Sequence, residues 1–341
     1  MTRKSSATTI REVAKYAGVS IATVSRYMNH TGLVSQEAGE RISAVMLDMN
    51  YVPRVAARQL ARSETRTAGL VITNVMNDFF APLINGVAAV ASENNYNLLV
   101  AVSRPEMRDK KFPSPIGPQN ADGMIVFANS LCEEQLIDLC KVHFPVVLLY
   151  CTSPANLDIS HIIIENKTAT QKIIDHMIEE HGRKRIMFFQ GPLDQEDSHW
   201  RELGYRASLA AHGIAMDDTL LLRGEFEHQA AYQALHEYLL KGSKDFDAIF
   251  TGNDDAAIGI LAALGEADIR VPEDVSVAGF DDFRMAPFMN PSLTTVRAPT
   301  EKVGQAAAEQ LAKAFKGEPV EREILLPTEI VLRRSCGCNY Q

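Results

Sequence analysis

Three polar motifs in the second half of the chain carry side chains that suit a hydroxyl-rich ligand. They are GPLDQEDSHWR at 191–201, TGNDD at 251–255 and GFDD at 279–282, and they contain Asp194, Asp197, Arg201, Asn253, Asp254, Asp281 and Asp282. Carboxylate, amide and guanidinium groups can each bond two neighbouring hydroxyls, and aromatic rings can stack on a sugar ring. The candidates for stacking are Phe79, Phe80, Trp200 and Phe226. Together these residues predict a binding site for a small, hydroxyl-rich ligand such as a sugar.

Structural roles for the same residues stay open on sequence alone. Arg201 could pair with Asp197, which lies four residues earlier. Asp254 and Asp282 could cap helices, and the phenylalanines could belong to a core.

Catalysis by these acidic residues is a second interpretation, because paired carboxylates can hydrolyse a glycoside. However, the chain has no glycine-rich phosphate loop, no serine nucleophile elbow and no HExxH motif, and its nine histidines are scattered. Cys336 and Cys338 could hold a metal or form a redox pair, but two thiols without other ligands favour a solvent-facing tail. We therefore predict no catalytic residue, no cofactor and no metal.

The elements that position these motifs follow an α/β pattern of apolar runs and amphipathic segments. The runs at 68–73, 97–102, 123–128 and 145–150 predict buried strands of a first lobe, and those at 161–165, 184–190, 247–251 and 275–280 predict strands of a second. Helices are expected near 168–181, 200–212, 228–240 and 255–266. The segment 293–296 and a helix from Thr300 to about Phe315 should return the chain to the first lobe. Since ligands of such sheets lie beyond the carboxyl ends of strands, the polar motifs should meet.

Residues 9–28 predict a helix-turn-helix, a common device for reading the DNA major groove. Thr9 and Glu12 form a capping-box pattern at the start of the first helix. Gly18 supplies the bend, Ser20 caps the second helix, and Val24 should point inward. A third helix over 35–50 should close the small core.

The second of these helices presents a face that could contact DNA. Arg26 could make a paired hydrogen bond to a guanine edge, while Ile21 and Ala22 could touch thymine methyl groups. The full set of expected contacts on this helix is Ile21, Ala22, Thr23, Ser25, Arg26 and Asn29. A small helical bundle without DNA-binding activity is the alternative.

Residues 50–65, NYVPRVAARQLARSET, predict a short basic helix with Arg54, Arg58 and Arg62 spaced four apart. About nine helical residues are too few to be stable alone, so the segment should fold on contact with a partner. Leu60 could then part a base step in the minor groove. An ordinary basic linker is the alternative.

The chain resembles the lactose/galactose repressor (LacI/GalR) family of bacterial regulators over nearly all of its 341 residues. The resemblance rests on the motifs VAKYAGVSIATVSRYMN, YVPRVAARQLA, GRKRIMFFQGP with WRELGY, TGNDDAAIG, and VPEDVSVAGFDD followed by PSLTTVRAP. It implies an all-α helix-turn-helix head on an α/β core of two doubly wound lobes joined by three strands, like a periplasmic sugar-binding protein. It also implies a homodimer that binds nearly palindromic double-stranded operator DNA.

The resemblance also implies roles for individual residues. Leu60 matches the family's wedge, Ala57 the small residue where paired hinge helices meet, and Ile21, Ala22 and Arg26 match positions that read DNA. The residues that match the family's effector pocket are Arg201, Asn253 and Asp281, with Phe79, Phe80 and Phe226 at its aromatic positions.

Two departures from the family pattern affect these expectations. Tyr150 stands where the family often has Asp or Asn at a strand end, so we count it among the effector-binding residues as one that alters recognition. Segment 106–123 contains three prolines and two glycines where a helix is usual, and it predicts a loop that reshapes one lobe.

The division of the chain follows from these motifs. We expect a DNA-binding head at 1–50, a hinge at 51–65 and a two-lobed core at 66–341, with the first lobe near 66–165 and 293–324 and the second near 166–292 and 325–341. Residues 1–66 carry a net charge of +5 and the remainder −14, which together make the −9 of the whole chain. A basic head on an acidic body fits a protein that meets phosphate at one end.

No run of about 18 apolar residues and no secretory signal is present, and the five cysteines are odd in number and irregularly spaced. We therefore expect a cytoplasmic protein without membrane contact. The whole pattern predicts a ligand-responsive transcriptional repressor of carbohydrate-utilisation genes, switched by a sugar or sugar phosphate rather than a nucleobase. A cytoplasmic sugar-binding protein or glycoside-acting enzyme is the alternative.

Overall fold

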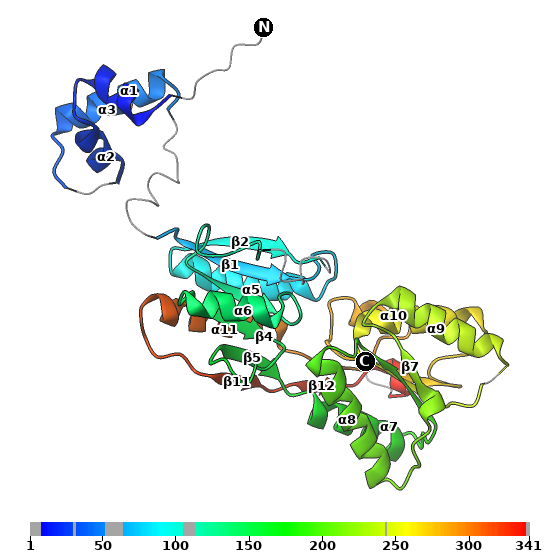
Figure 1. The fold of residues 1–341 in the computed structure, drawn as a ribbon. Coiled ribbons are helices and arrows are strands. Elements are labelled where there is room, and N and C mark those ends of the chain that lie inside the picture. The colour runs from blue at the N-terminus through cyan, green and yellow to red at the C-terminus, as the bar shows by residue number, and fades with distance from the viewer. Residues whose placement is uncertain (1–7, 30–31, 52–63, 105–112, 243, 339–341) are drawn as a thin grey trace. The chain divides into compact units, whose positions relative to one another are not determined.

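The structure is a computed structural model that describes residues 8–29, 32–51, 64–104, 113–242 and 244–338. The chain forms two compact units, residues 1–65 and 66–341. Each is described by itself (Figure 1).

The first unit is a three-helix head with α1 (Ile10–Ala17), α2 (Ile21–Asn29) and α3 (Gln36–Asp48). The predicted capping box is confirmed, because the Thr9 backbone N–H donates to the Glu12 carboxylate over 2.7 Å and the Glu12 N–H returns a bond to the Thr9 hydroxyl. Gly18 ends α1 with a φ of 67°, and the Ser20 hydroxyl accepts from the Thr23 N–H at the start of α2. These local bonds place α2 across α1.

The head core is small and wholly apolar. Its buried members are Val13, Ala14, Ala17, Val24 and Ile42. Val24 is 0% exposed, as its predicted inward position requires. The third helix begins after its Ser35 cap but ends at Asp48, two residues earlier than expected.

The larger sheet of the second unit contains six parallel strands. They are β1 (Thr67–Ile72), β2 (Asn97–Val102), β3 (Gly123–Phe127), β4 (Val146–Leu149), β5 (Ser160–Ile164) and β11 (Glu323–Leu326), in the order β11-β5-β4-β3-β1-β2. Alternating side chains pack on opposite faces, as a pleated strand requires. Leu70, Ile125 and Leu149 face the helices α5 (Phe80–Glu93) and α11 (Thr300–Phe315), whereas Val71 and Val126 face α6 (Glu133–Lys141).

Two strand predictions need correction. The run at 97–102 forms the edge strand β2, whose residues are half-buried or exposed rather than buried, since only one neighbour covers it. The run at 161–165 pairs as β5 with β4 in the larger sheet, which agrees with the expected first-lobe range of 66–165 and not with its expected place among the strands of the second lobe. A buried parallel strand has the same apolar signature in either lobe, so its sequence could not decide between them.

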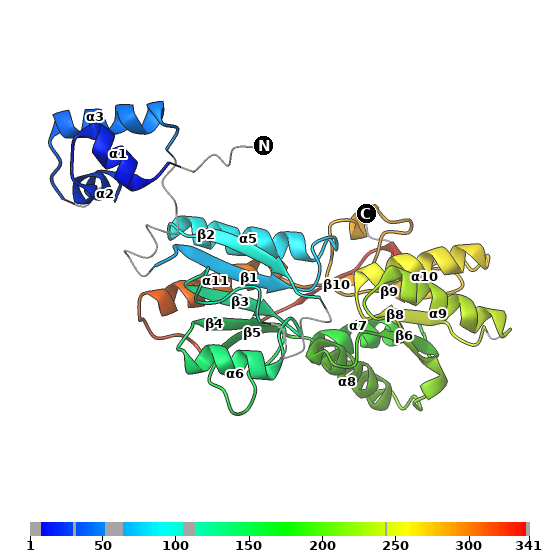
Figure 2. The ribbon, with the colours of Figure 1, turned by 45° about the horizontal axis from the view of Figure 1, so that its top comes forward.

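The second lobe is built on a four-stranded parallel sheet in the order β7-β6-β8-β9. Figure 2 shows β6, β8 and β9 among the helices of this lobe. Its strands are β6 (Ile186–Gln190), β7 (Leu221–Arg223), β8 (Ala248–Thr251) and β9 (Ser276–Ala278), and its helices are α7 (Lys167–Glu179), α8 (Glu196–Ala211), α9 (His228–Leu240) and α10 (Asp254–Glu266). Phe188 and Phe250 pack in the cluster with α7 and α8, while Met187 and Phe189 pack with α9 and α10. Both faces of this sheet are therefore covered, as in a doubly wound fold.

The chain passes between the lobes after β5, after β10 (Thr295–Arg297) and between β11 and β12 (Glu329–Val331), and β10 pairs antiparallel with β12. Helix α11 then packs against α5 with the predicted bounds of Thr300 and Phe315. Gly86 and Gly304 sit where each helix meets the other's backbone, so a Cβ at either position would collide with a carbonyl oxygen. This close contact fixes the returned segment on the first lobe.

The proline-rich segment is described from residue 113 onward, and residues 113–122 contain no helix or strand. Ile116 is 0% exposed and packs in the core cluster with Val71 and Leu139, so the loop fills the face where α6 lies. The side chain also lies directly over Gly69, which leaves no room for a Cβ there. In the described part of the chain, no helix has the length and hydropathy needed to cross a bilayer.

Candidate functional site

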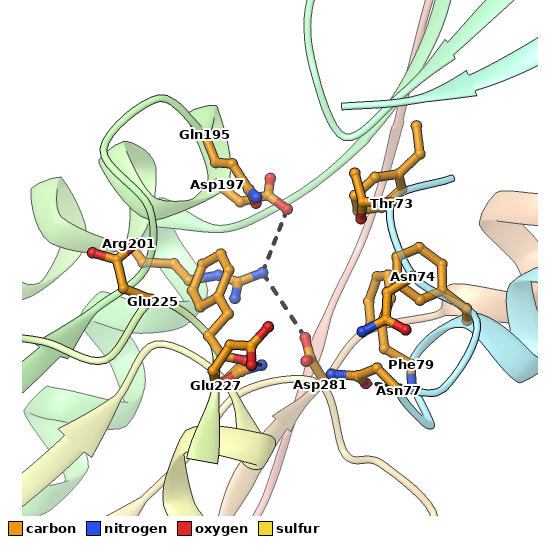
Figure 3. Close-up of a pocket in the computed structure, with 14 residues that line it drawn as sticks. Thr73, Asn74, Asn77, Phe79, Gln195, Asp197, Arg201, Glu225, Glu227 and Asp281 are labelled. Carbon is orange, nitrogen blue, oxygen red and sulfur yellow. Dashed lines mark hydrogen bonds and ion pairs between the residues drawn. The ribbon is translucent and has the colours of Figure 1, made fainter. Parts of the chain in front are cut away.

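A cavity of about 120 Å³ lies at the carboxyl ends of strands from both lobes. The first lobe contributes Thr73, Asn74, Asn77, Phe79, Phe80 and Phe127. The second lobe contributes Gln195, Asp197, Arg201, Glu225, Phe226, Glu227, Asn253 and Asp281. The two sets face each other across the space (Figure 3). This is the place at which doubly wound sheets bind ligands.

Arg201 is the central positive group of this cavity and is only 3% exposed. Its Nε donates to the Asn166 side-chain oxygen over 2.8 Å, and its Nη1 donates to the Gly252 carbonyl. Its Nη2 lies 3.5 Å from an Asp197 oxygen and 4.0 Å from an Asp281 oxygen (Figure 3). The pairing of Arg201 with Asp197 that sequence left as an alternative therefore exists within the cavity itself.

The Arg201 guanidinium also lies over two aromatic rings. The Arg201 Cζ is 3.7 Å from the centre of the Phe280 ring and 5.3 Å from the Phe226 ring. A cation over an aromatic face is favourable when desolvated, so the rings help to hold the charge in this buried place. The group is thus fixed in position before any ligand arrives.

Burial dominates the electrostatics of the acids beside Arg201. It raises the pKa of Asp281 to about 7, although the guanidinium acts in the opposite direction. Burial likewise raises the pKa of Asp197, again against the effect of Arg201. Asp281 also has a backbone φ of 119°, a conformation that costs an L residue free energy and that proteins retain chiefly at functional sites.

The neighbouring acids Asp254 and Asp282 do not line the cavity. Asp254 is the first residue of α10, where it accepts from the Thr295 hydroxyl over 2.6 Å and from the Phe283 N–H over 3.0 Å. Asp282 pairs with Arg297 over 2.7 Å and with Arg333 over 2.6 Å. Neither is a helix cap as suggested, but both have the structural roles that the alternative interpretation expected.

Asn253 and Phe226 are positioned by a shared loop contact. Asn253 caps α10 by accepting from the Ala256 N–H, and its Nδ2 donates to the Phe226 carbonyl over 3.0 Å. Phe226 itself has a φ of 58°. Its ring covers Gly191 and Gly252, where any Cβ would overlap it. Because neither glycine has a side chain, the Phe226 ring has room to enter the cavity.

Tyr150 is not among the residues that line the cavity, but its hydroxyl interacts electrostatically with Asp197, Asp281 and Arg201, so its role in effector binding stays a prediction. Its ring packs behind the wall, 5.3 Å from Phe79 and 5.4 Å from Phe127, and the residue is 2% exposed. The backbone of Tyr150 has a φ of 58° directly after β4. Burial raises its hydroxyl pKa far above the usual range.

Phe79 and Phe80 have both of the roles that sequence left open. Both line the cavity, and Phe80 is also a buried member of the core cluster. Their rings contact each other edge to face at 5.3 Å. Trp200, another stacking candidate, is 42% exposed and is not among the cavity residues.

Sequence reasoning missed seven residues that line the cavity, namely Thr73, Asn74, Asn77, Phe127, Gln195, Glu225 and Glu227. A signal existed for some of them, because Asn74 follows β1 of the first lobe and Glu225 follows β7 of the second, so both come after the carboxyl ends of parallel strands, as the predicted motifs do. Two more carboxyl groups make the cavity distinctly acidic, with four acids against a single arginine that already has partners.

The head carries the second functional surface. On α2, Ile21 is 46% exposed, Ala22 and Arg26 are exposed, and Thr23 and Ser25 are half-buried. The Thr23 hydroxyl is bonded to Ser20, so it also supports the helix start. The expected contacts Arg54, Ala57, Arg58 and Leu60 lie outside the described residues, and so does the Asn29 side chain.

A helix-turn-helix head followed by a two-lobed body with a polar interlobe cavity defines the class of ligand-responsive transcriptional regulators. Residues 9–54 match the profile of bacterial regulatory proteins of the lacI family, and residues 174–336 match the periplasmic binding protein-like domain. The chain is 30% identical over 335 residues to the ribose operon repressor of Escherichia coli (strain K12), covering 96% of this chain and 98% of that protein. The chain therefore belongs to the lacI family of bacterial transcriptional regulators, which are not enzymes.

Solved structures with the same fold span nearly the whole chain. A complex of the transcriptional regulator CelR with cellobiose is 29% identical, with a TM-score of 0.71 over 96% of this chain and 99% of that one. The Lac repressor dimer bound to operator and an anti-inducer is 24% identical, with a TM-score of 0.78 over 97% of this chain and 99% of that one.

Proposed function

We propose that this regulator represses carbohydrate-utilisation genes in the cytoplasm, binding a nearly palindromic operator as a homodimer. A small neutral sugar in the interlobe cavity sets its affinity for DNA. The observation that carries the proposal is the cavity itself, in which both lobes supply hydrogen-bonding groups around the fixed Arg201. A ligand that contacts both lobes can favour one lobe arrangement by its differential affinity and so change how two hinges approach each other.

The charges of the cavity narrow the effector class. Asp197 and Asp281 lie 3.5 Å and 4.0 Å from the Arg201 guanidinium, which already has protein partners, and the exposed Glu225 and Glu227 line the same cavity. A phosphate group would enter a cavity lined by four acids, whereas sugar hydroxyls can donate to carboxylates and amides. The cavity therefore favours an uncharged sugar over the sugar phosphate that sequence left open. The cellobiose complex of a similar regulator agrees with this class.

Operator binding with a panel of compounds tests the proposal. DNA fragments flanking the gene would be labelled and titrated with protein by fluorescence anisotropy, with neutral sugars, sugar phosphates and nucleosides added in turn. We expect one neutral sugar to change the operator affinity at least about tenfold, which corresponds to an ordinary allosteric coupling free energy. Binding with no response to any neutral sugar would contradict the effector class. A failure to bind any fragment at low salt would contradict the operator assignment.

Replacing Leu60 with Ala should weaken specific operator binding by at least about tenfold, because the inserted side chain stabilises the kinked base step. Sugar binding by the body should not change. Leu240→Ala is the matched control, since Leu240 is 74% exposed on α9 in the other unit. Equal operator affinity of the Leu60 and Leu240 variants would contradict the wedge.

Replacing Arg26 with Ala should reduce discrimination between operator and random DNA by about 1–3 kcal/mol, the range of a paired contact with one base. Arg41→Ala is the control, because it removes the same charge from the head but from a side chain paired with Glu37 on α3. Competition with random DNA separates lost specificity from lost charge. If both variants lose affinity equally on operator and random DNA, Arg26 contacts phosphate and not a base.

A further inference from the structure

Four metal-ligating side chains that are far apart in the sequence meet at one end of the second lobe. His176 is in the last turn of α7 and His181 follows that helix, while Cys336 and Cys338 lie at the end of the described chain. Their ligand atoms all lie within 4.8 Å of one another. Cys336 is 0% exposed, so the expectation of a solvent-facing tail was wrong.

Four of the six distances between these atoms are close to the edges of a tetrahedral metal site, and all six are within 4.8 Å. The two Nε2 atoms are 3.2 Å apart, and the Cys338 Sγ lies 3.4 Å from the His176 Nε2 and 3.5 Å from the His181 Nε2. The Cys336 Sγ lies 3.8 Å from the His176 Nε2. Zinc bonds of about 2.05 Å to nitrogen and 2.3 Å to sulfur give tetrahedral edges of about 3.4 Å between nitrogens and about 3.6 Å between nitrogen and sulfur.

The backbone between the two cysteines is shaped for this convergence. Gly337 has a φ of 110°, which other residues rarely adopt, and a Cβ there would lie 3.1 Å from the His181 ring. The residue therefore lets the chain reverse against the imidazole, so that Cys338 folds back beside Cys336. Any side chain at position 337 would strain the turn and crowd one ligand.

Buried hydrogen bonds hold the cysteine turn on the lobe. The Ser276 hydroxyl donates to the Cys336 carbonyl over 2.8 Å, and the Ser335 hydroxyl donates to the Val277 carbonyl over 2.6 Å. The Thr294 hydroxyl lies 3.1 Å from the Cys336 Sγ, where it can donate to a thiolate. Such outer contacts orient metal ligands and tune their basicity.

We propose that His176, His181, Cys336 and Cys338 bind one zinc ion in a closed structural site. Two thiolates and two imidazoles are the donor set that selects zinc among the common divalent cations, and four protein ligands leave no position for water. Binding displaces the two thiol protons and joins the carboxyl-terminal turn to the end of α7. The cysteines are free thiols in the structure, and a disulfide between them would leave the converging imidazoles without a function.

Zinc titration of the full-length protein tests the site. The tag-free chain would be reduced, stripped with a chelator, and titrated with zinc against a chromophoric competitor, with bound metal counted by elemental analysis. We expect one zinc per chain and a rise in melting temperature on binding. With cobalt in place of zinc, we expect the visible bands of tetrahedral coordination and a thiolate-to-metal charge-transfer band. A reduced chain that binds no zinc at one equivalent would overturn the proposal.

Single-ligand variants locate the binding. Cys338→Ser and His181→Ala should each weaken zinc affinity by at least about a hundredfold and lose the metal-dependent rise in melting temperature. Cys132→Ser and His199→Ala are controls that remove the same groups elsewhere in the body, and they should behave as the parent protein does. His181 and Cys338 are both half-buried, so we expect the variants to fold, and circular dichroism checks that they do. Zinc affinity equal in all four variants would place the metal elsewhere and overturn the assignment.

Discussion

Replacing Asp281 with Asn is expected to abolish the response to the effector and to leave operator binding in place. The carboxylate lies at the edge of the cavity within 4.0 Å of the Arg201 guanidinium, where it can accept hydrogen bonds from ligand hydroxyls. An amide of the same size accepts through one oxygen only and carries no charge. The measurement is operator affinity with and without the sugar that the parent protein recognises. Asp218→Asn, on the exposed surface of the same lobe, is the control.

The pH dependence of sugar binding gives this prediction a second measurement. Because burial raises the pKa of Asp281 to about 7, the group is partly protonated in neutral solution without ligand. A ligand that donates hydroxyls to it binds the ionised form, so sugar affinity should fall as the pH drops from 8 to 6. The Asn variant should lack this dependence. A parent protein with constant sugar affinity across this range would argue against a direct contact at Asp281.

The stability of the folded protein should depend on pH in the opposite sense from sugar affinity, because the Asp281 contribution is larger at low pH. The folded pKa of Asp281 is about 7 and its ordinary pKa is about 3.8, so the folded state holds the proton more tightly than the unfolded chain does. Its contribution to stability is therefore complete below the unfolded pKa and is lost as the pH rises through 7. The Asn variant, which never ionises, should be more stable than the parent at pH 8, and the difference should shrink toward pH 5. Urea unfolding at several pH values measures it. A variant less stable than the parent at pH 8 would contradict the pKa shift.

Local signals in the sequence predicted much of the fold. The capping box at Thr9, the bend at Gly18 and the bounds of α11 each depend on a few neighbouring residues, and the structure has them as expected. The polar motifs after β6, β8 and β9 could be assigned to one place because parallel strands end at a common edge. A short segment is enough to show which residues follow the carboxyl end of a strand and which residues cap a helix.

Other features depend on contacts that no short segment contains. The apolar residues at 161–165 would suit a buried strand in either sheet, so they do not show which lobe the strand belongs to. The Tyr150 ring contacts Phe79, which is far away in the sequence, so no short segment could have predicted that packing. The cluster of His176 with Cys338 joins residues 162 positions apart, and only the packing of the chain end on α7 brings them together.

Replacing Arg201 with Leu should abolish sugar binding and destabilise the body by about 3–5 kcal/mol, the usual result of breaking a buried ion pair. Without the guanidinium, Asp197 and Asp281 would be left buried with no compensating charge, and the Gly252 carbonyl would lose a donor. Arg206→Leu on the same helix is the matched control, because its ion pair with Glu202 is partly exposed. We expect that substitution to cost no more than about 1 kcal/mol.

A double variant distinguishes the effect of uncompensated buried charge on stability from the loss of contacts with the ligand. Adding Asp281→Asn to Arg201→Leu removes one of the uncompensated acids, so it should recover part of the lost stability. Sugar binding should not return, because both polar groups that face the ligand are then absent. Thermal unfolding of the single and double variants measures the first effect, and titration with the sugar measures the second. If the double variant is less stable than the Arg201 variant alone, the two residues are not coupled by charge, and Arg201 stabilises the body through its packing against Phe280 instead.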